Sequence, residues 1–397
     1  MEIHGEGLPY VGGRDARPTG GKAVSPEFQP VECYTSRGCS GRLCGVMAMR
    51  FLVIRLSAIG DVVRTIPAVK GLRERYPAAY IAWLVEEKSS DILLDIPYID
   101  RVIVFPRTQL VRNPGPARGF VRELRRERFD TALDFHGIFK SGLLAFLSGA
   151  DERIGFARRY TKEFNFLFIN RTMVPPGERI SRFERNISLV ESLGAVPSSL
   201  DVEIVVPDEV KRDVEKMLEP FDRSRPLVAI HPTTSRPFKH WESGKYAKVA
   251  DRLLTDGIAQ VIVTCGPGEE DSARKVLSQM QSGPVPLVQN RSLREYAWLA
   301  KQADVYFGAD TGPMHIASAM GTPVVAMFGP TDPVVNGPYR QPHRVLYKEL
   351  PCSPCKERRC SRNLECMTAI TVEEAYDAIV GMLKSTRTES PRPPGEG

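Results

Sequence analysis

The chain has 397 residues, more than one compact core usually holds, so its length favours two domains. Hydrophobic residues make up 42% of it and charged residues 26%, which is typical of a soluble globular protein. The formal net charge of +6 suits an acidic ligand or an anionic membrane surface, but it is too small to indicate a nucleic-acid partner. No apolar run approaches the ~20 residues of a transmembrane helix, and residues 1–30 show no secretory pattern.

Residues 1–48 differ in character from the rest of the chain. Gly, Pro, Ser and Arg are scattered there without a helical or strand period, and the apolar surface is too small to offset the entropy of ordering. We therefore expect a disordered or loosely ordered extension, with the working fold beginning at Met49.

Residues 49–206 alternate between strand and helix patterns. The predicted strands are residues 51–56, 79–85, 102–105 and 131–135. The predicted helices are residues 60–76, 119–128, 142–147 and 181–193. We interpret this part as the first domain, which includes a further strand-like run at residues 202–206.

A link is predicted at residues 207–226, where Pro207 precedes a charged helix and a second proline-bounded stretch. The alternation then resumes. Strands are predicted at residues 227–230, 261–264, 305–307 and 324–328, and residues 287–288 form a short apolar step. Helices are predicted at residues 243–256, 269–279, 293–302 and 313–320. We assign residues 227–385 to a second domain and residues 386–397 to a disordered tail.

Alternation of this kind produces parallel sheets covered by helices. The predicted fold class is therefore α/β, with two doubly wound Rossmann-like domains facing a cleft. Ligands of such sheets bind beyond the carboxyl ends of the strands, so the residues that directly follow strands are the candidates for a site.

The segment from Asp310 to His315 is the first candidate. A strand ends, a turn with Gly312 follows, and a helix begins near Pro313, which suits the first position of a helix. The free backbone N–H groups and the dipole of such a helix attract an anion such as phosphate. Asp310 and Thr311 could equally act as simple helix caps.

The segment from His231 to Trp241 is the second candidate. It follows a strand and carries Thr233, Thr234 and Lys239, whose hydroxyl and ammonium groups could hold a pyrophosphate. The alternative is a polar loop with Ser243 as a helix cap.

Two segments of the first domain also follow strands. In the segment from Arg55 to Asp61, Asp61 could be a general base or an acid that interacts with the helix dipole. The segment from Asp134 to Ser141 carries His136 and Lys140, and its polar groups can reach the same edge of the sheet.

Glu269 follows another strand and could bind ribose hydroxyls or simply start a helix. The surrounding residues lack a complete G-x-G-x-x-G pattern, so no dinucleotide site is predicted. Further along, residues 352–366 hold four cysteines with the spacing C-x2-C-x4-C-x5-C. They could bind zinc or an iron–sulfur cluster, or they could be structural thiols or an opportunistic disulfide.

These segments together, in this order, resemble glycosyltransferase family 9, the ADP-heptose:lipopolysaccharide heptosyltransferases. The resemblance runs from about residue 49 to about residue 380. Its motifs are S-x-x-G-D at residues 57–61, D-x-Q-G-x-x-K-S at 134–141, R-I-G-F at 153–156, T-x-x-x-K-x-W at 234–241 and D-T-G-x-x-H at 310–315. The chain departs from the pattern by one extra residue before Trp241 and by His136 in place of Gln, and a histidine can become charged near neutral pH.

The resemblance implies an inverting transferase of the GT-B type that needs no metal ion and no cofactor. It implies that Asp61 and Lys239 are catalytic, with Asp61 as the base. The implied donor-binding residues are Thr233, Thr234, Lys239, Glu269, Asp310, Thr311, Gly312 and His315. The implied acceptor-binding residues are Ser57, Gly60, His136, Lys140 and Arg153.

The expected partners are ADP-heptose and a lipopolysaccharide core acceptor (Kdo-lipid A or a heptosyl core) at the inner membrane surface. The expected location is cytoplasmic, or peripheral at the inner face of the inner membrane. Two alternatives stay open: a GT-B transferase that uses another nucleotide sugar or glycan, and a metal-binding or redox protein that uses the cysteine cluster.

Overall fold

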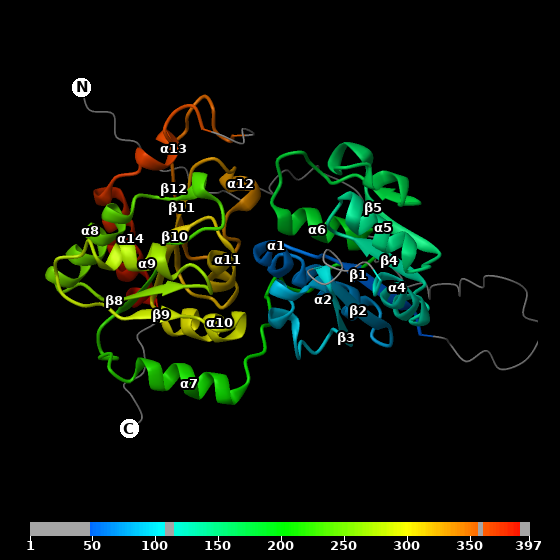
Figure 1. Ribbon diagram of the computed structural model, residues 1–397, viewed down its shortest axis with the longest axis horizontal. Helices are drawn as coiled ribbons and strands as arrows, with labels where there is room; N and C mark the ends of the chain where they lie inside the picture. Colours follow the sequence, from blue (N-terminus) through cyan, green and yellow to red (C-terminus); the bar gives the residue numbers. More distant parts are fainter. Residues whose placement is uncertain (1–47, 108–114, 356–359, 390–397) are drawn as a thin grey trace, which may run out of the picture. The chain divides into compact units, whose positions relative to one another are not determined.

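A computed structural model describes residues 48–107, 115–355 and 360–389 of the chain (Figure 1). The predicted N-terminal extension, except for its last residue, lies outside the described residues. Of the predicted tail, residues 390–397 also lie outside them.

The first sheet has six parallel strands in the order β3-β2-β1-β4-β5-β6. In chain order the strands are β1 (Arg50–Ile54), β2 (Tyr80–Glu86), β3 (Arg101–Phe105), β4 (Thr131–Asp134), β5 (Glu152–Phe156) and β6 (Arg171–Met173). The described helices of this part are α1 (Ile59–Val63), α2 (Ile66–Arg75), α4 (Ala117–Arg126), α5 (Phe139–Leu147) and α6 (Arg182–Glu191). Short 3-10 helices lie at Glu87–Ser89, Asp91–Leu93, Arg158–Tyr160 and Asn165–Leu167.

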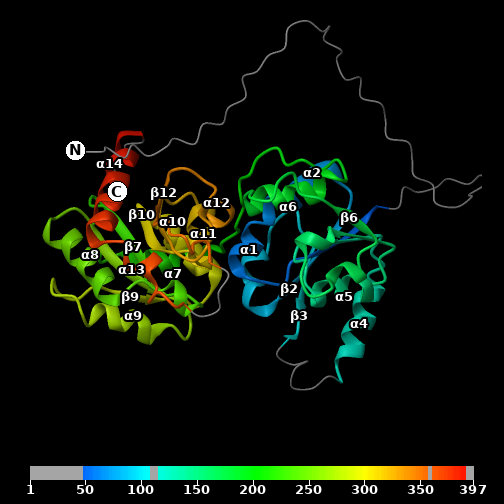
Figure 2. The ribbon, with the colours of Figure 1, turned by 90° about the horizontal axis from the view of Figure 1, so that it is seen from above.

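Both faces of this sheet are buried, which explains why its central strands are apolar without alternation. Phe51 and Val53 of β1 pack on the face covered by α2 and α6, and Leu52 and Ile54 pack on the face covered by α4 and α5. Figure 2 shows these two pairs of helices on opposite sides of the strands.

The second sheet repeats the design, with six parallel strands in the order β12-β11-β10-β7-β8-β9. Its strands are β7 (Leu227–His231), β8 (Gln260–Cys265), β9 (Leu287–Gln289), β10 (Val305–Ala309), β11 (Val324–Phe328) and β12 (His343–Tyr347). Its helices are α7 (Asp208–Leu218), α8 (Ser243–Thr255), α9 (Glu270–Leu277), α10 (Leu293–Gln302), α11 (Gly312–Ala319), α12 (Pro333–Asn336), α13 (Glu365–Thr368) and α14 (Val372–Glu389). A 3-10 helix lies at Pro237–Lys239.

The order of strands reverses direction once in each sheet. The chain runs outward from β1 to β3 and then returns to β4 on the other side of β1, and it does the same from β7 to β9 and back to β10. The crevice at such a reversal, outside the carboxyl ends of the strands, is where doubly wound sheets bind ligands. The loops after β1, β4, β7 and β10 are therefore the candidates for a site.

Several elements differ from the sequence predictions. The helix predicted at residues 60–76 is two helices, because Pro67 lacks an N–H group and restarts the helix near its own position. Residues 202–206 form no strand, although Val202, Ile204 and Val206 are buried. Strands β5, β6 and β12 were not predicted.

Helix α14 was also not predicted, and it continues through residues 386–389, where the tail was expected to begin. Ala375, Ile379 and Leu383 on one side of it pack with α8 against the second sheet. None of the described helices combines the length and the apolar character that a bilayer span requires.

We predict that Ile379→Ala lowers the free energy of unfolding by about 2–5 kcal/mol, because Ile379 is fully buried between α14 and the sheet. Gly381→Ala on the exposed side should instead raise it by up to about 1 kcal/mol, since an added methyl group meets no atom within 4 Å. Urea denaturation of both variants checks the pair. Equal effects of the two substitutions would contradict the packing of α14.

Candidate active site

Asp310 directly follows β10 and is the centre of the first cluster of polar side chains. Lys239 donates to its carboxylate over 2.5 Å, and the Thr331 hydroxyl donates to the same oxygen over 2.7 Å. His315 of α11 lies 3.8 Å from the other oxygen. The loop after β7 and the start of α11 therefore meet at this carboxylate, as predicted for Lys239 and Asp310.

Neither Asp310 nor Thr311 acts as a simple helix cap. Thr311 occupies the N-cap position of α11, but its side chain makes no capping hydrogen bond. The Asp310 carboxylate is engaged by Lys239 and Thr331 instead. The amide groups of the first turn of α11 receive no side-chain cap, so they remain suited to an anion.

The surroundings of Asp310 and His315 decide which of the two side chains is charged. Burial alone would raise the pKa of Asp310, but nearby His315 and Lys239 hold that pKa below its usual range. Burial and the positive charge of Arg64 lower the pKa of His315 to about 4. Asp310 is consequently an anion and His315 is neutral at pH 7.

A second cluster lies at the carboxyl ends of β7 and β8. Thr233 donates to the Glu269 carboxylate over 2.6 Å, and Glu269 also accepts from the Gly266 N–H over 3.0 Å. His231, a residue that sequence reasoning did not select, lies 2.9 Å from the Thr233 hydroxyl, and burial lowers its pKa to about 4. Glu269 therefore does more than start a helix, because its carboxylate connects the loop after β7 to the loop after β8 by hydrogen bonds.

Thr234 takes part in neither cluster. Its hydroxyl donates to the Arg236 carbonyl and accepts from the Arg236 N–H, which is a local turn. The predicted cap at Ser243 is wrong, because the N-cap position of α8 is occupied by Glu242.

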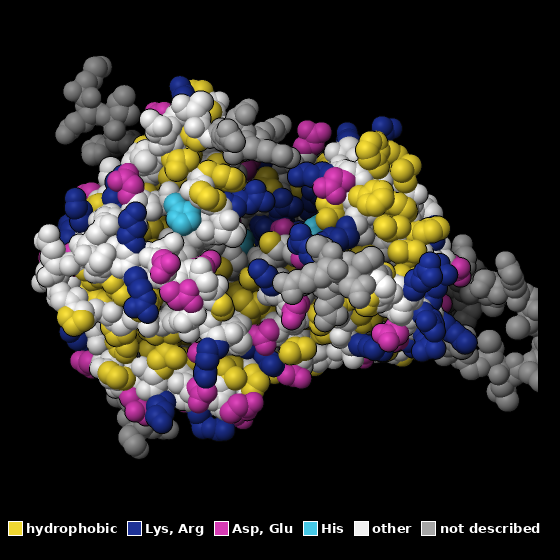
Figure 3. Space-filling model, in the orientation of Figure 1, with side chains coloured by type: hydrophobic (Ala, Val, Ile, Leu, Met, Phe, Trp, Pro, Cys, Tyr) yellow, Lys and Arg dark blue, Asp and Glu magenta, His cyan; other side chains and the backbone are white. Residues whose placement is uncertain are grey.

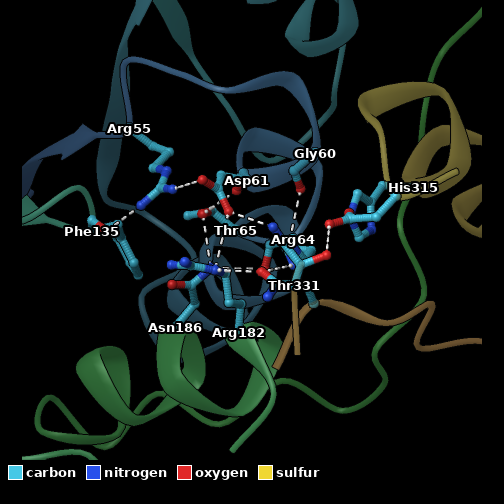
Figure 4. Close-up of polar contacts among 12 residues, drawn as sticks. Arg55, Gly60, Asp61, Arg64, Thr65, Phe135, Arg182, Asn186, His315 and Thr331 are labelled. Carbon is cyan, nitrogen blue, oxygen red and sulfur yellow. Dashed lines mark hydrogen bonds and ion pairs between the residues drawn. The ribbon is translucent and has the colours of Figure 1, made fainter. Parts of the chain in front are cut away.

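Asp61 of α1 is the centre of a third cluster, shown in Figure 4. Arg64 donates to one carboxylate oxygen over 2.5 Å, Arg55 forms an ion pair with the other, and Arg182 of α6 lies 3.6 Å away. The carboxylate binds these guanidinium groups, so it is more than an acid at a helix start. Sequence reasoning missed all three arginines.

The positions of two of these arginines in the sequence could have indicated that they lie near Asp61. Arg55 directly follows β1, and Arg64 stands three residues after Asp61 on the same helical face. Arg182 comes from a helix far along the chain and is placed only by the packing of α6 on α2.

The ionisation of Asp61 follows from its neighbours. Burial alone would raise the pKa of Asp61, but the positive charges of Arg55, Arg64 and Arg182 hold that pKa well below its usual value. Asp61 is therefore an anion with its lone pairs engaged. It can accept a proton readily only when some of this positive charge is drawn to another anion.

Gly60 and Gly312 allow the helix of Asp61 to approach the helix of the first cluster. A methyl group on Gly60 would lie 2.4 Å from a ring carbon of His315. One on Gly312 would lie 3.0 Å from the side chain of Ile59. The two glycines therefore bring α1 and α11 together, with Asp61 and His315 on either side of this contact.

His136 lies in the loop after β4 and is held by the buried Asp134. Asp134 accepts from the backbone N–H groups of His136 and Gly137 and from the Ser141 hydroxyl. The His136 Nδ1 accepts from the Leu56 N–H over 3.3 Å, which leaves Nε2 as the protonated nitrogen. Burial, with Arg55 nearby, lowers the pKa of His136 to about 3, so the expected charging near neutral pH is wrong.

The other predicted acceptor residues lie in three different settings. Ser57 is half-buried in the turn between β1 and α1. Lys140 forms an ion pair with Glu86. Arg153 lies at the amino end of β5, where it donates to the carbonyls of Phe168 and Ala150, so its guanidinium supports the backbone and lies at the wrong end of the strand for this site.

The cysteine segment offers no metal centre among the residues described. No group of three or more His, Cys, Asp or Glu side chains in the described part of the chain could hold a metal ion. Cys360 is exposed and its sulfur accepts from the N–H groups of Arg362 and Leu364, whereas Cys366 is buried in the core of the second sheet. Burial and the other cysteines of the segment raise the pKa of Cys366, so the four thiols lie near one another, and both interpretations of the segment stay predictions.

The two doubly wound parallel sheets form a fold of the GT-B type. The glycosyl transferase family 9 structure from Veillonella parvula has a TM-score of 0.75 at 22% identity and covers 85% of this chain and 98% of its own. The Escherichia coli heptosyltransferase WaaC with ADP-2-deoxy-2-fluoro heptose has a TM-score of 0.63 at 22% identity, with 86% and 99% covered.

The family follows from the sequence comparison. The model of glycosyltransferase family 9 (heptosyltransferase) matches residues 117–365, more than half of the chain, and the chain therefore belongs to this family and is a glycosyltransferase. Lipopolysaccharide heptosyltransferase 1 of Pseudomonas aeruginosa is 27% identical over 320 residues, which are 79% of this chain and 88% of that protein. Asp61 precedes the residues that the family model matches.

We predict that the free energy of unfolding falls as the pH falls from about 6.5 to 4. His231 and His315 are buried and neutral with pKa values near 4, so the unfolded chain binds protons in this range that the folded chain does not. Each histidine contributes up to about 1.4 kcal/mol per pH unit. Urea denaturation at several pH values measures the slope. His315→Gln should flatten it, and an unchanged slope in that variant would contradict a neutral His315.

Proposed function

We propose that this glycosyltransferase moves heptose from ADP-heptose to an anionic lipopolysaccharide inner-core acceptor, Kdo-lipid A or a heptosyl core, with inversion at the anomeric carbon and without a metal ion. The observation that carries the proposal is the approach of α1 to α11 through Gly60 and Gly312, which brings the carboxylate of Asp61 near the phosphate-binding start of α11. The names of the relatives, lipopolysaccharide heptosyltransferases, support the sugar and the acceptor class.

On the donor side, the residues of the second sheet hold ADP-heptose. The free amides of the first turn of α11 and the ammonium group of Lys239 stabilise the negative charge that develops on the leaving diphosphate. Glu269, which Thr233 holds in place, accepts from the ribose hydroxyls. Because these groups supply positive charge and amide donors, no divalent cation is needed.

On the acceptor side, residues of the first sheet supply the base. An acceptor hydroxyl attacks the anomeric carbon as the bond to the diphosphate breaks, and Asp61 accepts the hydroxyl proton. His136, with Nε2 protonated, donates a hydrogen bond to an acceptor oxygen. Sugars then bind between loops of residues 49–206 and the nucleotide binds on residues 227–385.

The arginines around Asp61 fit an acidic acceptor. Arg182 is the most exposed of the three, with 36% of its side chain accessible, and it reaches both Asp61 and the Asn336 side chain. A carboxylate or phosphate on the acceptor would compete with Asp61 for this guanidinium. The pKa of Asp61 would then rise toward its usual value, so the base becomes effective only when the acceptor is bound. The enzyme would work where this lipid acceptor is made, at the inner face of the inner membrane.

We predict that Asp61→Asn lowers kcat for heptose transfer at least 100-fold, because it removes the base. ADP binding, measured by calorimetry, should change by no more than about twofold. Asp208→Asn, at an exposed position in α7, is the matched control and should transfer at the wild-type rate. Wild-type transfer by Asp61→Asn would show that another group is the base.

We also predict that Lys239→Met weakens ADP binding about tenfold or more and lowers kcat, because the Lys239 ammonium group contacts Asp310 just before the proposed diphosphate-binding start of α11. Calorimetry with ADP and a transfer assay in the presence of EDTA measure the two effects. Unchanged ADP binding would contradict the donor site, and loss of wild-type transfer in EDTA would contradict metal independence.

A further inference from the structure

Four large apolar side chains are exposed together on the first sheet's side of the chain, over α5 and the turn at residues 163–168. Phe139 and Phe146 of α5 are 43% and 50% exposed, and Phe164 and Leu167 of the turn are 66% and 65% exposed. The Phe168 ring lies between them, 5.2 Å from that of Phe139 and 6.2 Å from that of Phe146. We name these five residues the apolar patch.

The turn that carries Phe164 is held firmly against α5. A methyl group on Gly142 of α5 would lie 2.6 Å from the Asn165 amide and 3.0 Å from the Phe168 ring, so the two segments pack closely. Glu163 and Phe164 both have positive φ angles, of 56° and 60°, a conformation that is unfavourable for a phenylalanine. Neither local conformation nor burial within the chain explains a phenylalanine at this exposed tip.

Basic side chains lie beside the apolar patch. Exposed arginines of α4 and its C-terminal end line a hollow of about 650 Å³ together with Leu147, the last residue of α5: Arg118, Arg122, Arg125, Arg126 and Arg128. Arg125 donates to the Leu147 carbonyl over 3.0 Å, which joins the two helices. Figure 3 shows hydrophobic side chains gathered over α5 and the neighbouring turns, with Lys and Arg side chains next to them over α4.

More positive charge lies close to the turn at residues 163–168. Arg158, Arg159 and Lys162 are exposed, and the Arg158 guanidinium lies 4.6 Å from the centre of the Phe166 ring. An apolar centre with cations around it matches an anionic bilayer, in which the apolar side chains enter the interface and the cations meet the phosphate groups.

The patch is continuous with the loop of the proposed acceptor site. The Lys162 N–H donates to the Gly137 carbonyl over 2.8 Å, and the Asn165 amide donates to the buried Asp134 carboxylate over 2.7 Å. Asp134 is the residue that holds His136 in place. A surface that contacts a bilayer here would present the His136 loop to the head group of a lipid lying in that bilayer.

We propose that the apolar patch and the arginines of α4 form a docking surface for an anionic phospholipid bilayer. This inference rests on the proposed function, because a docking surface would serve an enzyme whose acceptor lies in a membrane. Its test is independent of that function, because it measures binding to lipid without any sugar transfer. The chosen residues contact neither Asp61 nor Lys239 in any described interaction, so they can be changed without touching the proposed chemistry.

The test is flotation of the full chain with vesicles of phosphatidylglycerol and phosphatidylethanolamine, compared with vesicles of phosphatidylcholine alone. The wild-type chain should bind the anionic vesicles at least tenfold more strongly, and this binding should fall at least fivefold between low and high salt. F164S/L167S and R122Q/R126Q should each weaken it about tenfold or more.

Control variants carry comparable changes at exposed positions outside the patch. V196S alters a side chain that is 62% exposed outside the patch, and R223Q/R225Q removes two exposed arginines from the segment before β7. Both should bind vesicles as the wild type does. Circular dichroism and thermal midpoints of all variants should be unchanged, because every substituted side chain is exposed.

Transfer to a water-soluble, delipidated acceptor separates this inference from the proposed function. The patch variants should transfer to it at the wild-type rate while they lose vesicle binding. Wild-type vesicle binding by F164S/L167S, equal binding to neutral vesicles, or no binding by the wild-type chain would each overturn the docking surface. Absence of heptose transfer with intact, patch-dependent vesicle binding would instead overturn the proposed function alone.

Discussion

The reversal of strand order in each parallel sheet is the constraint on which the rest of the structure depends. In a parallel sheet the loops that follow the strands all lie at the same edge. At the reversal of strand order the neighbouring helices pack on opposite faces of the sheet, which leaves a crevice between the loops. In the first sheet this brings together helix α1, which follows β1 and carries Asp61, and the loop after β4, which carries His136. In the second sheet it brings together the loops after β7 and β10, which carry Lys239 and Asp310.

Electrostatics at these loops is governed by burial and by pairing. Asp310 is buried and Asp61 is half-buried. Both carboxylates stay charged, because Lys239 compensates the first and arginines compensate the second. By contrast, burial lowers the pKa of His136 to about 3 and that of His315 to about 4, so both imidazoles are uncharged at neutral pH. The site therefore holds fixed anions, fixed cations and neutral hydrogen-bonding imidazoles, an arrangement suited to stabilising a charge that develops during transfer.

Outside the site, the large apolar side chains lie in two kinds of place. Most of them fill the faces of the sheets, and Trp83 and Tyr306 are examples with no exposed surface. The apolar patch is different, because it lies on the outside and is flanked by arginines of α4. A folded chain that leaves such side chains in water forgoes a stabilising burial, which a bilayer would restore.

The sequence by itself determined the class of fold and indicated the strand ends at which the candidate site lies. Alternating strand and helix patterns predicted two parallel α/β units, and residues directly after strands predicted Asp61, Lys239, Glu269 and Asp310, because strand ends and ligand sites coincide in such sheets. Sequence alone missed short edge strands such as β6, since three residues carry too little periodicity to recognise.

Only the tertiary structure decided which of these residues meet. Arg182 reaches Asp61 from 121 positions along the chain, and Arg153, one residue of a well-matched motif, lies at the far end of its strand. It also decided that His136 is neutral, because the burial that lowers its pKa comes from chain segments distant in sequence. Local pattern specifies elements and strand ends, whereas distances between side chains and the desolvation of charges depend on how those elements pack.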